Sequence, residues 1–289
     1  SWLCRRLSHL VSMPPKRLTE PANQAQEFLQ TVRKIFEKKY SNELDAISRY
    51  EEDVFGFNVQ WEHLVGSQLH SLFPNNPNKA LDLGNQVLLE QLQNRNCRTI
   101  PKIRIVDLPD DFHYVIDDLR MRDANRLLNF DAVVTKVDNP MGWLKVSKYT
   151  CRDCGHVWEI EQRLARERIR AKFCSVCLEK LLAKSKGERF IPPENIEMVV
   201  DENEYSDVQY IELSSPLGLS NIDEAYNISA VIGDEYVGTL KPGSRININA
   251  FVRIDHLPNR DYQLDTRRVL LLEIHSIEFG FKYYRYSLD

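Results

Sequence analysis

Four of the six cysteines in this chain form two close pairs. Two residues separate Cys151 from Cys154. Cys174 and Cys177 repeat that spacing after nineteen intervening residues. This layout lets two hairpin knuckles each give two thiolate sulfurs to one tetrahedral zinc ion, and Gly155 permits the tight turn of the first knuckle. Four thiolates leave no open position for water, so we predict one structural zinc per chain.

Two alternatives to this ligand set follow from the same residues. His156 can replace one of the sulfurs. A redox role is disfavoured, because a CxxC redox motif opens a helix after a strand in a thioredoxin-like unit and does not occur as two knuckles. The two cysteine pairs favour a metal site over disulfide bonds, and so indicate a reducing compartment. The other two cysteines, Cys4 and Cys97, are expected to be plain thiols.

The composition is that of an ordinary folded protein, with 289 residues of which 43% are hydrophobic and 28% charged. At about 150 residues per domain, this length indicates two compact units. The 38 basic and 42 acidic residues give a net charge of -4, so the chain has no global positive field for a nucleic acid. No run approaches the roughly 18 apolar residues of a membrane span, and we expect no membrane partner.

Charge is unevenly distributed along the second half of the sequence. Residues 145–190 contain twelve Lys or Arg and six Asp or Glu, whereas residues 190–240 contain eleven acidic residues and no Lys or Arg. Such runs are typical of solvated faces and also of local binding patches. A nucleic-acid partner would have to bind to a patch of this kind.

Catalytic motifs are missing from the sequence. It contains no GxxxxGKS or GxxxxGKT phosphate loop, no GxGxxG at a strand–helix junction, no GxSxG elbow and no HExxH. The seven histidines include no pair at ligand spacing, and Asp110 and Asp111 are typical of negative charge at a helix N-terminus. We therefore expect that this chain is not itself an enzyme.

The pattern of apolar residues predicts an α+β fold whose first part is helical. Residues 1–15 are expected to be a leader or tag, and residues 16–100 a helical subdomain. Within that subdomain the pattern predicts a helix from Thr19 to about Tyr40, a short strand at 54–59, a helical segment through 63–73 closed by Pro74, a turn at 75–78 and a helix through 81–92.

From Ile103 onwards, alternating and β-branched runs predict a small OB-type antiparallel barrel, with a tight turn at Lys241–Gly243. The cysteine pairs interrupt it as an inserted zinc-binding lobe. Residues 101–150 are expected to form the first part of the barrel, and residues 151–190 the zinc-binding lobe. Residues 191–289 are expected to form the rest of the barrel, including a long β-hairpin. Strands are predicted at 103–106, 130–137, 208–213, 227–232, 245–254 and 269–279.

Several motifs stand in a characteristic order, which includes Ile105–Pro109, the first barrel strand at Leu127–Val137, the four cysteines, Tyr205–Leu213 and Gly238–Ile246. Through them, residues 16–280 resemble the N-terminal domain of the minichromosome maintenance (MCM) replicative helicases. The lack of a long charged N-terminal tail favours an archaeal member. The resemblance implies a protein of the archaeal cytoplasm that associates with the nucleoid, or a nuclear protein if the source is a eukaryote.

The resemblance also implies partners. In that family the domain forms a hexameric ring, or a double hexamer, around single- or double-stranded DNA, and the zinc lobes join neighbouring subunits. About six copies would focus positive potential into one channel, which reconciles DNA binding with a net charge of -4. A C-terminal AAA+ ATPase motor, absent from this chain, and other replication factors would complete the helicase.

The resemblance places a positively charged hairpin at Arg253–Arg268. Its arginines Arg260, Arg267 and Arg268 would face DNA phosphates, which the planar arginine fork can bind bidentately without reading sequence. In relatives, arginines that follow the first barrel strand face single-stranded DNA. This sequence has no evident arginines at that position. Their substitutes would be Lys136, Lys145 and Lys148. Trp143 can stack on a base, but a buried position at the rim of the barrel is favoured for it.

One loop departs from the family pattern. Ser214–Asn227 resembles the loop that relays signals to the motor, but Ala225–Tyr226 stands where relatives often have a Pro-Arg pair. The contact that the arginine makes in relatives therefore has no evident equivalent.

Two other functions are consistent with a barrel and a zinc site. One is a stand-alone adaptor that binds single-stranded nucleic acid on the barrel face. The other is a ligase-like nucleotidyl transferase, whose Lys-x-Asp-Gly nucleophile motif is approached by Lys136–Asn139. That string lacks the glycine and lies on a predicted barrel strand, so the enzyme is disfavoured.

Overall fold

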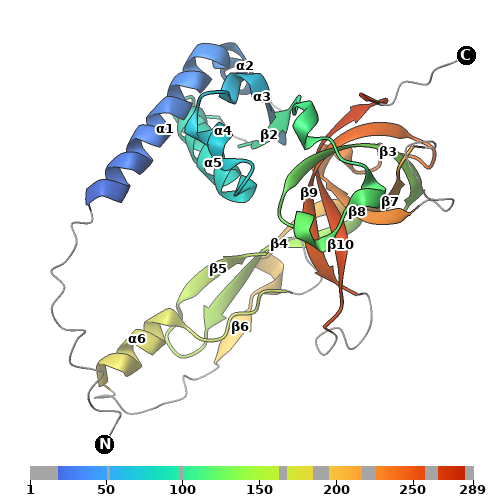
Figure 1. The fold of residues 1–289 in the computed structure, drawn as a ribbon. Helices are drawn as coiled ribbons and strands as arrows, with labels where there is room; N and C mark the ends of the chain where they lie inside the picture. Colours follow the sequence, from blue (N-terminus) through green and yellow to red (C-terminus); the bar gives the residue numbers. More distant parts are fainter. Residues whose placement is uncertain are drawn as a thin grey trace, which may run out of the picture. The chain divides into compact units, whose positions relative to one another are not determined.

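The computed structural model describes residues 19–50, 53–97, 100–162, 168–184, 195–216, 226–257 and 266–283. The chain divides into two compact units, Ser1–Asp107 and Leu108–Asp289 (Figure 1). Within the part that is described, no helix is long and apolar enough to cross a membrane.

The first unit is mainly helical. Phe36, at the centre of its core, makes edge-to-face contacts with Tyr40 and Phe57. An ion pair of 2.6 Å between Arg33 and Glu90 links the first and the last of its helices. The elements are α1 (Thr19–Lys39), α2 (Ser41–Ile47), β1 (Gly56–Gln60), α3 (Trp61–Leu64), α4 (Gln68–Leu72), α5 (Pro77–Gln93) and β2 (Lys102–Val106).

Two helix boundaries differ from those predicted. The single helical segment predicted through 63–73 is split into α3 and α4, because Gly66 adopts a left-handed φ of 83° that interrupts the helix. The turn predicted at 75–78 is instead the start of α5. The Asn76 side chain accepts a hydrogen bond from the Lys79 N–H at 3.2 Å, and Pro77 takes the first helical position, where no N–H is needed.

The strand predicted at 103–106 is present as β2, but it does not belong to the barrel. It pairs in parallel with β1, with Phe57 opposite Ile103, inside the first unit. Asn85 on α5 accepts a hydrogen bond from the Ile103 N–H at 2.8 Å. A Cβ atom at Gly84 would lie 2.8 Å from the Ile103 side chain, so glycine is what lets β2 pack closely on α5.

The second unit contains the OB-type barrel. The strand order is β3-β9-β10-β8-β7-β4-β5, β6 pairs with β4, and an additional pairing of β3 with β7 closes the barrel. The elements are β3 (Leu127–Val137), β4 (Met141–Cys151), β5 (Val157–Glu161), α6 (Ser175–Lys184), β6 (Ile196–Met198), β7 (Glu204–Ser214), β8 (Asn227–Gly233), β9 (Arg245–His256) and β10 (Arg268–Phe279).

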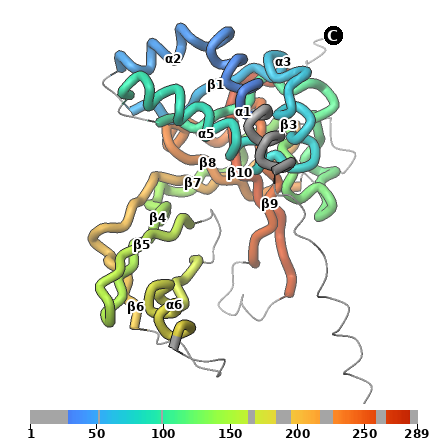
Figure 2. Tube along the Cα trace, turned by 90° about the vertical axis from the view of Figure 1, so that its left-hand side faces the viewer, coloured from blue at the N-terminus to red at the C-terminus, as the bar shows by residue number. Residues whose placement is uncertain are grey.

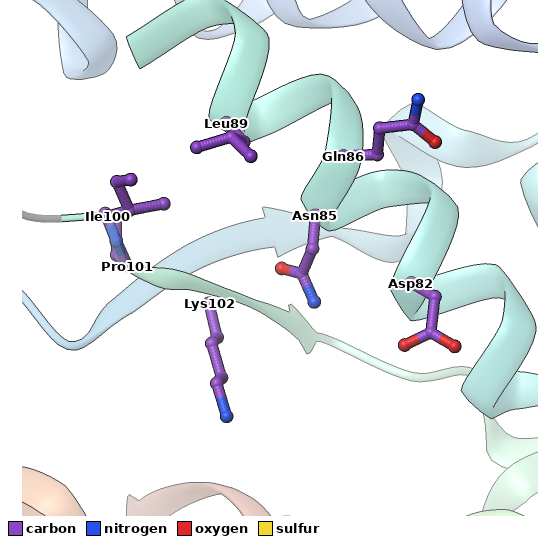
Figure 3. Close-up of a pocket in the computed structure, with 7 residues that line it drawn as sticks. All are labelled: Asp82, Asn85, Gln86, Leu89, Ile100, Pro101 and Lys102. Carbon is purple, nitrogen blue, oxygen red and sulfur yellow. The ribbon is translucent and has the colours of Figure 1, made fainter. Parts of the chain in front are cut away.

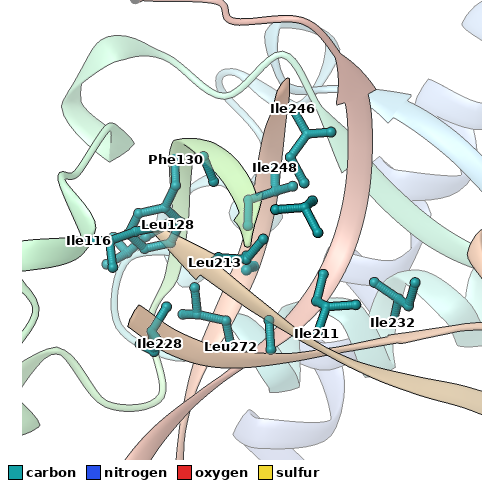
Figure 4. Close-up of a cluster of buried hydrophobic side chains, with 14 of the residues drawn as sticks. Ile116, Leu128, Phe130, Ile211, Leu213, Ile228, Ile232, Ile246, Ile248 and Leu272 are labelled. Atoms are coloured by element: carbon teal, nitrogen blue, oxygen red, sulfur yellow. The ribbon is translucent and has the colours of Figure 1, made fainter. Parts of the chain in front are cut away.

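The barrel core is filled by side chains from β3, β7, β8, β9 and β10 (Figure 4). Alternate residues of β3 and β9, such as Leu128, Phe130, Ile246 and Ile248, are fully buried there, and Ile116 closes one end. These strands pair antiparallel, with Phe130 opposite Ile248. The alternation on which the barrel prediction rested is therefore confirmed.

The barrel is antiparallel, as predicted, at every pairing but one. Strands β8 and β10 run parallel, with Leu271 opposite Ser229. The closed path β3, β9, β10, β8, β7 returns to β3, and all its other pairings are antiparallel. A closed ring with an odd number of strands must contain one parallel pair, so closure itself imposes the exception.

The tight turn predicted at Lys241–Gly243 is confirmed. The Ser244 N–H donates to the Lys241 carbonyl at 3.0 Å, and Gly243 has a left-handed φ of 88°. The predicted long hairpin is formed by β9 and β10, whose register extends to the pair His256 and Arg268.

A buried polar ladder runs along one side of the barrel. Asn129 and Asp131 on β3 face Asn249 and Asn247 on β9, and all four are at most 4% exposed. The Asp131 carboxylate accepts hydrogen bonds from the Asn247 side chain at 2.7 Å and from the backbone N–H groups of residues 282 and 283 at 2.9 and 2.8 Å. Asp131 thus fixes the segment after β10 to the barrel.

We expect Asp131→Ala to lower the free energy of unfolding by about 3 kcal/mol, because it leaves three donors without their acceptor. Urea denaturation measures this loss. Asp138→Ala is the control, since Asp138 is 44% exposed in an ion pair and its loss should change stability by less than about 0.5 kcal/mol. Equal effects of the two substitutions would contradict the anchoring role.

Candidate metal centre and nucleic-acid interface

The cysteines lie on an extension of the barrel sheet. One end of β4 pairs with β7 in the barrel, and the other end pairs with β5 and β6, where Tyr149 is opposite both Trp158 and Met198. Helix α6 lies beside these strands (Figure 2). We call residues 145–162, 168–184 and 195–198 the cysteine lobe.

The four predicted ligands meet in the lobe. The Sγ atoms of Cys151 and Cys177 are 3.7 Å apart, those of Cys154 and Cys174 are 3.6 Å apart, and all four sulfurs lie within 4.8 Å of one another. A tetrahedral zinc ion with bonds of about 2.3 Å holds its sulfurs about 3.8 Å apart. The sulfurs are therefore spaced for a metal ion and too far apart for disulfide bonds.

The first pair has the predicted knuckle geometry. Gly155 has a left-handed φ of 70° and donates its N–H to the Cys151 carbonyl at 2.9 Å, while the Cys151 N–H donates to the His156 carbonyl at 2.9 Å. The His156 ring stacks on Trp158 at 5.5 Å with an angle of 15°. In the described part of the chain, the side chains close enough together to hold a metal ion are those of the four cysteines, without His156.

The second pair is not the hairpin knuckle that the spacing suggested. Cys174 immediately precedes α6, Cys177 lies in its first turn, and the Leu178 N–H donates to the Cys174 carbonyl at 2.9 Å. A helix start brings residues three apart onto one side just as a knuckle does, so the same spacing fits both structures.

Without a cation, the thiols resist full ionisation. A hydrogen bond from the His156 backbone lowers the pKa of Cys154 to about 7. The hydrogen bond with Cys154 raises the pKa of Cys177 to about 12, and burial raises that of Cys174. One thiolate forms easily and is then stabilised by neighbours that keep their protons. Four thiolates in this space therefore require a bound cation.

Two of the lysines predicted to face DNA are already in ion pairs. Lys136 lies 3.0 Å from the Asp138 carboxylate and 3.4 Å from that of Glu212, and these groups raise its pKa. Lys148 lies 2.5 Å from Glu202, which raises its pKa as well. Lys145 is exposed.

The hairpin arginines are only partly described. Arg267 is exposed, and the half-buried Arg268 donates from its guanidinium to the Arg267 carbonyl at 2.8 Å. Arg260 lies outside the described residues, as do all the residues from 258 to 265. Both views show the paired arms of β9 and β10 extending from the barrel (Figures 1 and 2).

The predicted relay loop is described only at its ends. Residues 217–225, including Ala225, lie outside the described part. Tyr226, which follows, donates its N–H to the Asp117 carboxylate at 3.3 Å. Trp143 is half-buried against Val208, Val231 and Leu271, which agrees with the barrel-rim prediction.

The first unit contains a shallow cavity of about 310 Å³ between α5 and the start of β2 (Figure 3). At its wall, the side-chain oxygen of Asn85 already accepts a hydrogen bond from the Ile103 N–H. None of the residues that line it is a histidine, cysteine or serine. They are Asp82, Asn85, Gln86, Leu89, Ile100, Pro101 and Lys102.

One residue that organises the lobe was not found from sequence. Gln162 is 9% exposed, and its side-chain amide binds the backbone of Ile169 in two places. The amide oxygen accepts a hydrogen bond from the Ile169 N–H at 2.8 Å, and the amide nitrogen donates to the Ile169 carbonyl at 3.1 Å. The same nitrogen donates to the buried Ser147 hydroxyl at 2.7 Å. A single glutamine carries no spacing signal, so only the structure identifies it.

Comparison with known proteins places this architecture in a class. The sequence model of the MCM OB domain matches residues 115–256, which run from just before Ile116 to the end of β9. The fold is similar to that in the 1.8 Å crystal structure of the N-terminal domain of an archaeal MCM, with a TM-score of 0.68 and 20% sequence identity. The similarity covers 89% of this chain and all of that one. A search of curated protein sequences found no match.

The class is thus that of OB-barrel proteins with an inserted cysteine lobe. Residues 115–256 match the model of the MCM OB domain, and the fold of the chain is similar to that of an archaeal MCM N-terminal domain. The resemblance that the ordered motifs indicated is confirmed.

We expect Cys174→Ser to release about one metal ion per chain and to open the lobe, because three sulfurs cannot complete the ligand set. Elemental mass spectrometry and the fluorescence of Trp158 measure the two effects. Cys97→Ser removes a thiol from the first unit and is the control, with metal content unchanged. A full metal complement in Cys174→Ser would contradict this site.

Proposed function

We propose that this chain is the DNA-binding and ring-forming domain of an MCM-type replicative helicase. The observation that carries the proposal is the match of residues 115–256 to the MCM OB domain. The barrel, the paired arms of β9 and β10 and the cysteine lobe all fit this function. The sequence lacks a phosphate-binding loop, so ATP hydrolysis would be supplied by a C-terminal AAA+ ATPase module.

We further propose that the lobe holds one structural zinc ion through Cys151, Cys154, Cys174 and Cys177. The sulfur spacing and the thiol donor set support zinc, which prefers four thiolates in closed structural sites. The bound ion would supply a rigid link between the end of β4 and the start of α6. A lobe made rigid in this way can serve as a contact between neighbouring subunits.

DNA would be bound through its phosphates. Arg260, Arg267 and Arg268 on the hairpin, with Lys145, are proposed to face the polyanion. Lys136 can join them by exchanging its carboxylate partners for a phosphate, at low cost because exposed ion pairs contribute only about 0–1 kcal/mol. The half-buried Lys148 would likewise exchange Glu202 for a phosphate. Such contacts follow the backbone of single- or double-stranded DNA without reading sequence.

Ring formation would concentrate these cations. A single chain has a net charge of -4, whereas about six copies with hairpins directed at one axis would create a positive channel. The proposed partners are therefore further copies of this chain in a hexamer or double hexamer, DNA, the motor module and other replication factors. The proposed location is the nucleoid in the cytoplasm of an archaeon, or the nucleus of a eukaryote.

We expect Arg267→Ala/Arg268→Ala to weaken binding of both single-stranded and duplex DNA and to reduce the salt slope by about 1.5 to 2, since two phosphate contacts are lost. Fluorescence anisotropy over a salt series measures both quantities. Lys34→Ala/Lys38→Ala removes two exposed charges from α1 and is the matched control. Equal affinities of the two variants at low salt would remove the hairpin from the proposed function.

Light scattering separates the ring from the alternative of a stand-alone single-strand-binding adaptor. A hexamer of the 33.8 kDa chain has a mass of about 200 kDa, and we expect a species of that size or twice that size at micromolar concentration. Full DNA affinity in a protein that remains monomeric would favour the adaptor instead.

A further inference from the structure

The four sulfurs of the cysteine lobe differ in their access to solvent. Cys154 is exposed and Cys177 is half-buried, whereas Cys151 and Cys174 are only 3% and 2% exposed. Oxidants attack cysteine in its thiolate form, and a site in which four cysteines bind zinc holds all its sulfurs in that form. A small oxidant in solution therefore reaches the sulfur of Cys154 first.

Two short sulfur–sulfur contacts join one cysteine pair to the other. The Sγ atom of Cys154 lies 3.6 Å from that of Cys174, and the Sγ atom of Cys151 lies 3.7 Å from that of Cys177. A disulfide bond is about 2.05 Å long, so each contact must close by about 1.6 Å to become one. Small movements of the side chains and the backbone are therefore enough to bond the two pairs to each other.

Bonds between the pairs would tie two different elements of the lobe together. Cys151 is the last residue of β4 and Cys154 lies in the turn that follows it, whereas Cys174 immediately precedes α6 and Cys177 lies in its first turn. Few hydrophobic side chains are buried in the described part of the lobe. Once a bound cation is lost, only bonds between the pairs would therefore keep β4 and α6 linked.

The second cysteine pair lies at the start of a helix, which is where redox enzymes carry a CxxC pair whose two cysteines bond to each other. Reactive cysteines of that kind are at least partly exposed. Here Cys174 is buried, and the exposed cysteine of the cluster, Cys154, belongs to the other pair. The sulfur that is oxidised first therefore has Cys174 at contact distance, which favours a bond between the pairs.

We propose that the cysteine lobe is a reversible oxidation site for hydrogen peroxide. Cys154 reacts first, and the products are two disulfide bonds, one between Cys154 and Cys174 and one between Cys151 and Cys177. The proposal rests on the structural zinc site proposed above, and it adds an oxidised, zinc-free state to that site. Thiol reductants, which a reducing compartment supplies, return the lobe to its metal-binding form.

The reaction balances with hydrogen peroxide as the oxidant. The Cys154 thiolate attacks one peroxide oxygen, the O–O bond breaks, and a sulfenic acid and a hydroxide ion are formed. The Cys174 thiolate then attacks the Cys154 sulfur, an S–S bond forms, and the S–O bond breaks to release a second hydroxide ion. A second peroxide oxidises Cys151 and Cys177 in the same way. In total the four thiolates lose four electrons, two peroxides become four hydroxide ions, and one Zn²⁺ ion is released.

Peptide mapping tests which sulfurs become bonded. The variant Cys4→Ser/Cys97→Ser keeps the four lobe cysteines as its only thiols. After its metal-loaded form has reacted with two equivalents of hydrogen peroxide, it is alkylated and digested with trypsin, which cleaves after Arg152 and so separates the two cysteines of the first pair.

Bonds between the pairs would join the three tryptic peptides 149–152, 153–163 and 173–180 into one species. Fragmentation of that species between the two cysteines of 173–180 assigns each bond. A product in which 149–152 is bonded only to 153–163, together with an internal bond in 173–180, would overturn the proposal.

Trapping with dimedone, which reacts with sulfenic acids, tests which sulfur reacts first. With dimedone in excess and less than one equivalent of peroxide, we expect most of the label on peptide 153–163, which contains Cys154. Label mainly on 149–152 or on 173–180 would overturn the role of Cys154 as the first target.

Metal content separates this inference from the zinc site on which it rests. A chromophoric chelator should detect about one zinc ion per chain released by two equivalents of peroxide, and a thiol reductant with added zinc should restore the full content. If the untreated protein holds its metal and peroxide releases none, or if the loss is not reversed, this inference fails and the zinc site stands. If the untreated protein holds no metal, the zinc site itself fails.

Discussion

The structure of the cysteine lobe depends on the interaction among four sulfurs. Across its described residues, the hydrophobic side chains that are buried are only those of Tyr149, Cys151 and Cys174, whereas Val157, Ile169, Phe173 and Leu182 are exposed. So small an apolar core cannot offset the conformational entropy of ordering three strands and a helix. The proposed cation, bound by four thiolates, would supply the missing free energy and would also stabilise all four thiols in their ionised form, in spite of their opposing pKa shifts.

The barrel provides the base on which that lobe is built. Strand β4 runs from its pairing with β7 to its pairing with β5 and β6 without interruption, apart from a register shift between Leu144 and Val146. Closure of the barrel fixes β7, and β7 in turn fixes β4. The chain thus uses one continuous strand to transmit the order of a large hydrophobic core to a lobe that has almost none of its own.

Local patterns in the sequence were enough to predict most of the fold. The alternating run at 208–213 predicted β7, and the cysteine spacing predicted the sulfur cluster, because both signals lie within a few residues. Features that depend on distant partners were not predictable. The pairing of β2 with β1 joins two distant segments, and the packing of β2 on α5 depends on close approach at Gly84. The ion pair of Lys136 with Glu212 joins residues that are 76 positions apart in the sequence. The buried position of Asp131 likewise depends on distant partners, because its donors come from β9 and from beyond β10.

X-ray absorption at the zinc edge of the purified protein tests the central claim most directly. The account predicts a single shell of four sulfur neighbours at about 2.3 Å, as four cysteine thiolates require. A shell that contains nitrogen or oxygen, or a protein whose folded lobe holds no metal at all, would contradict it.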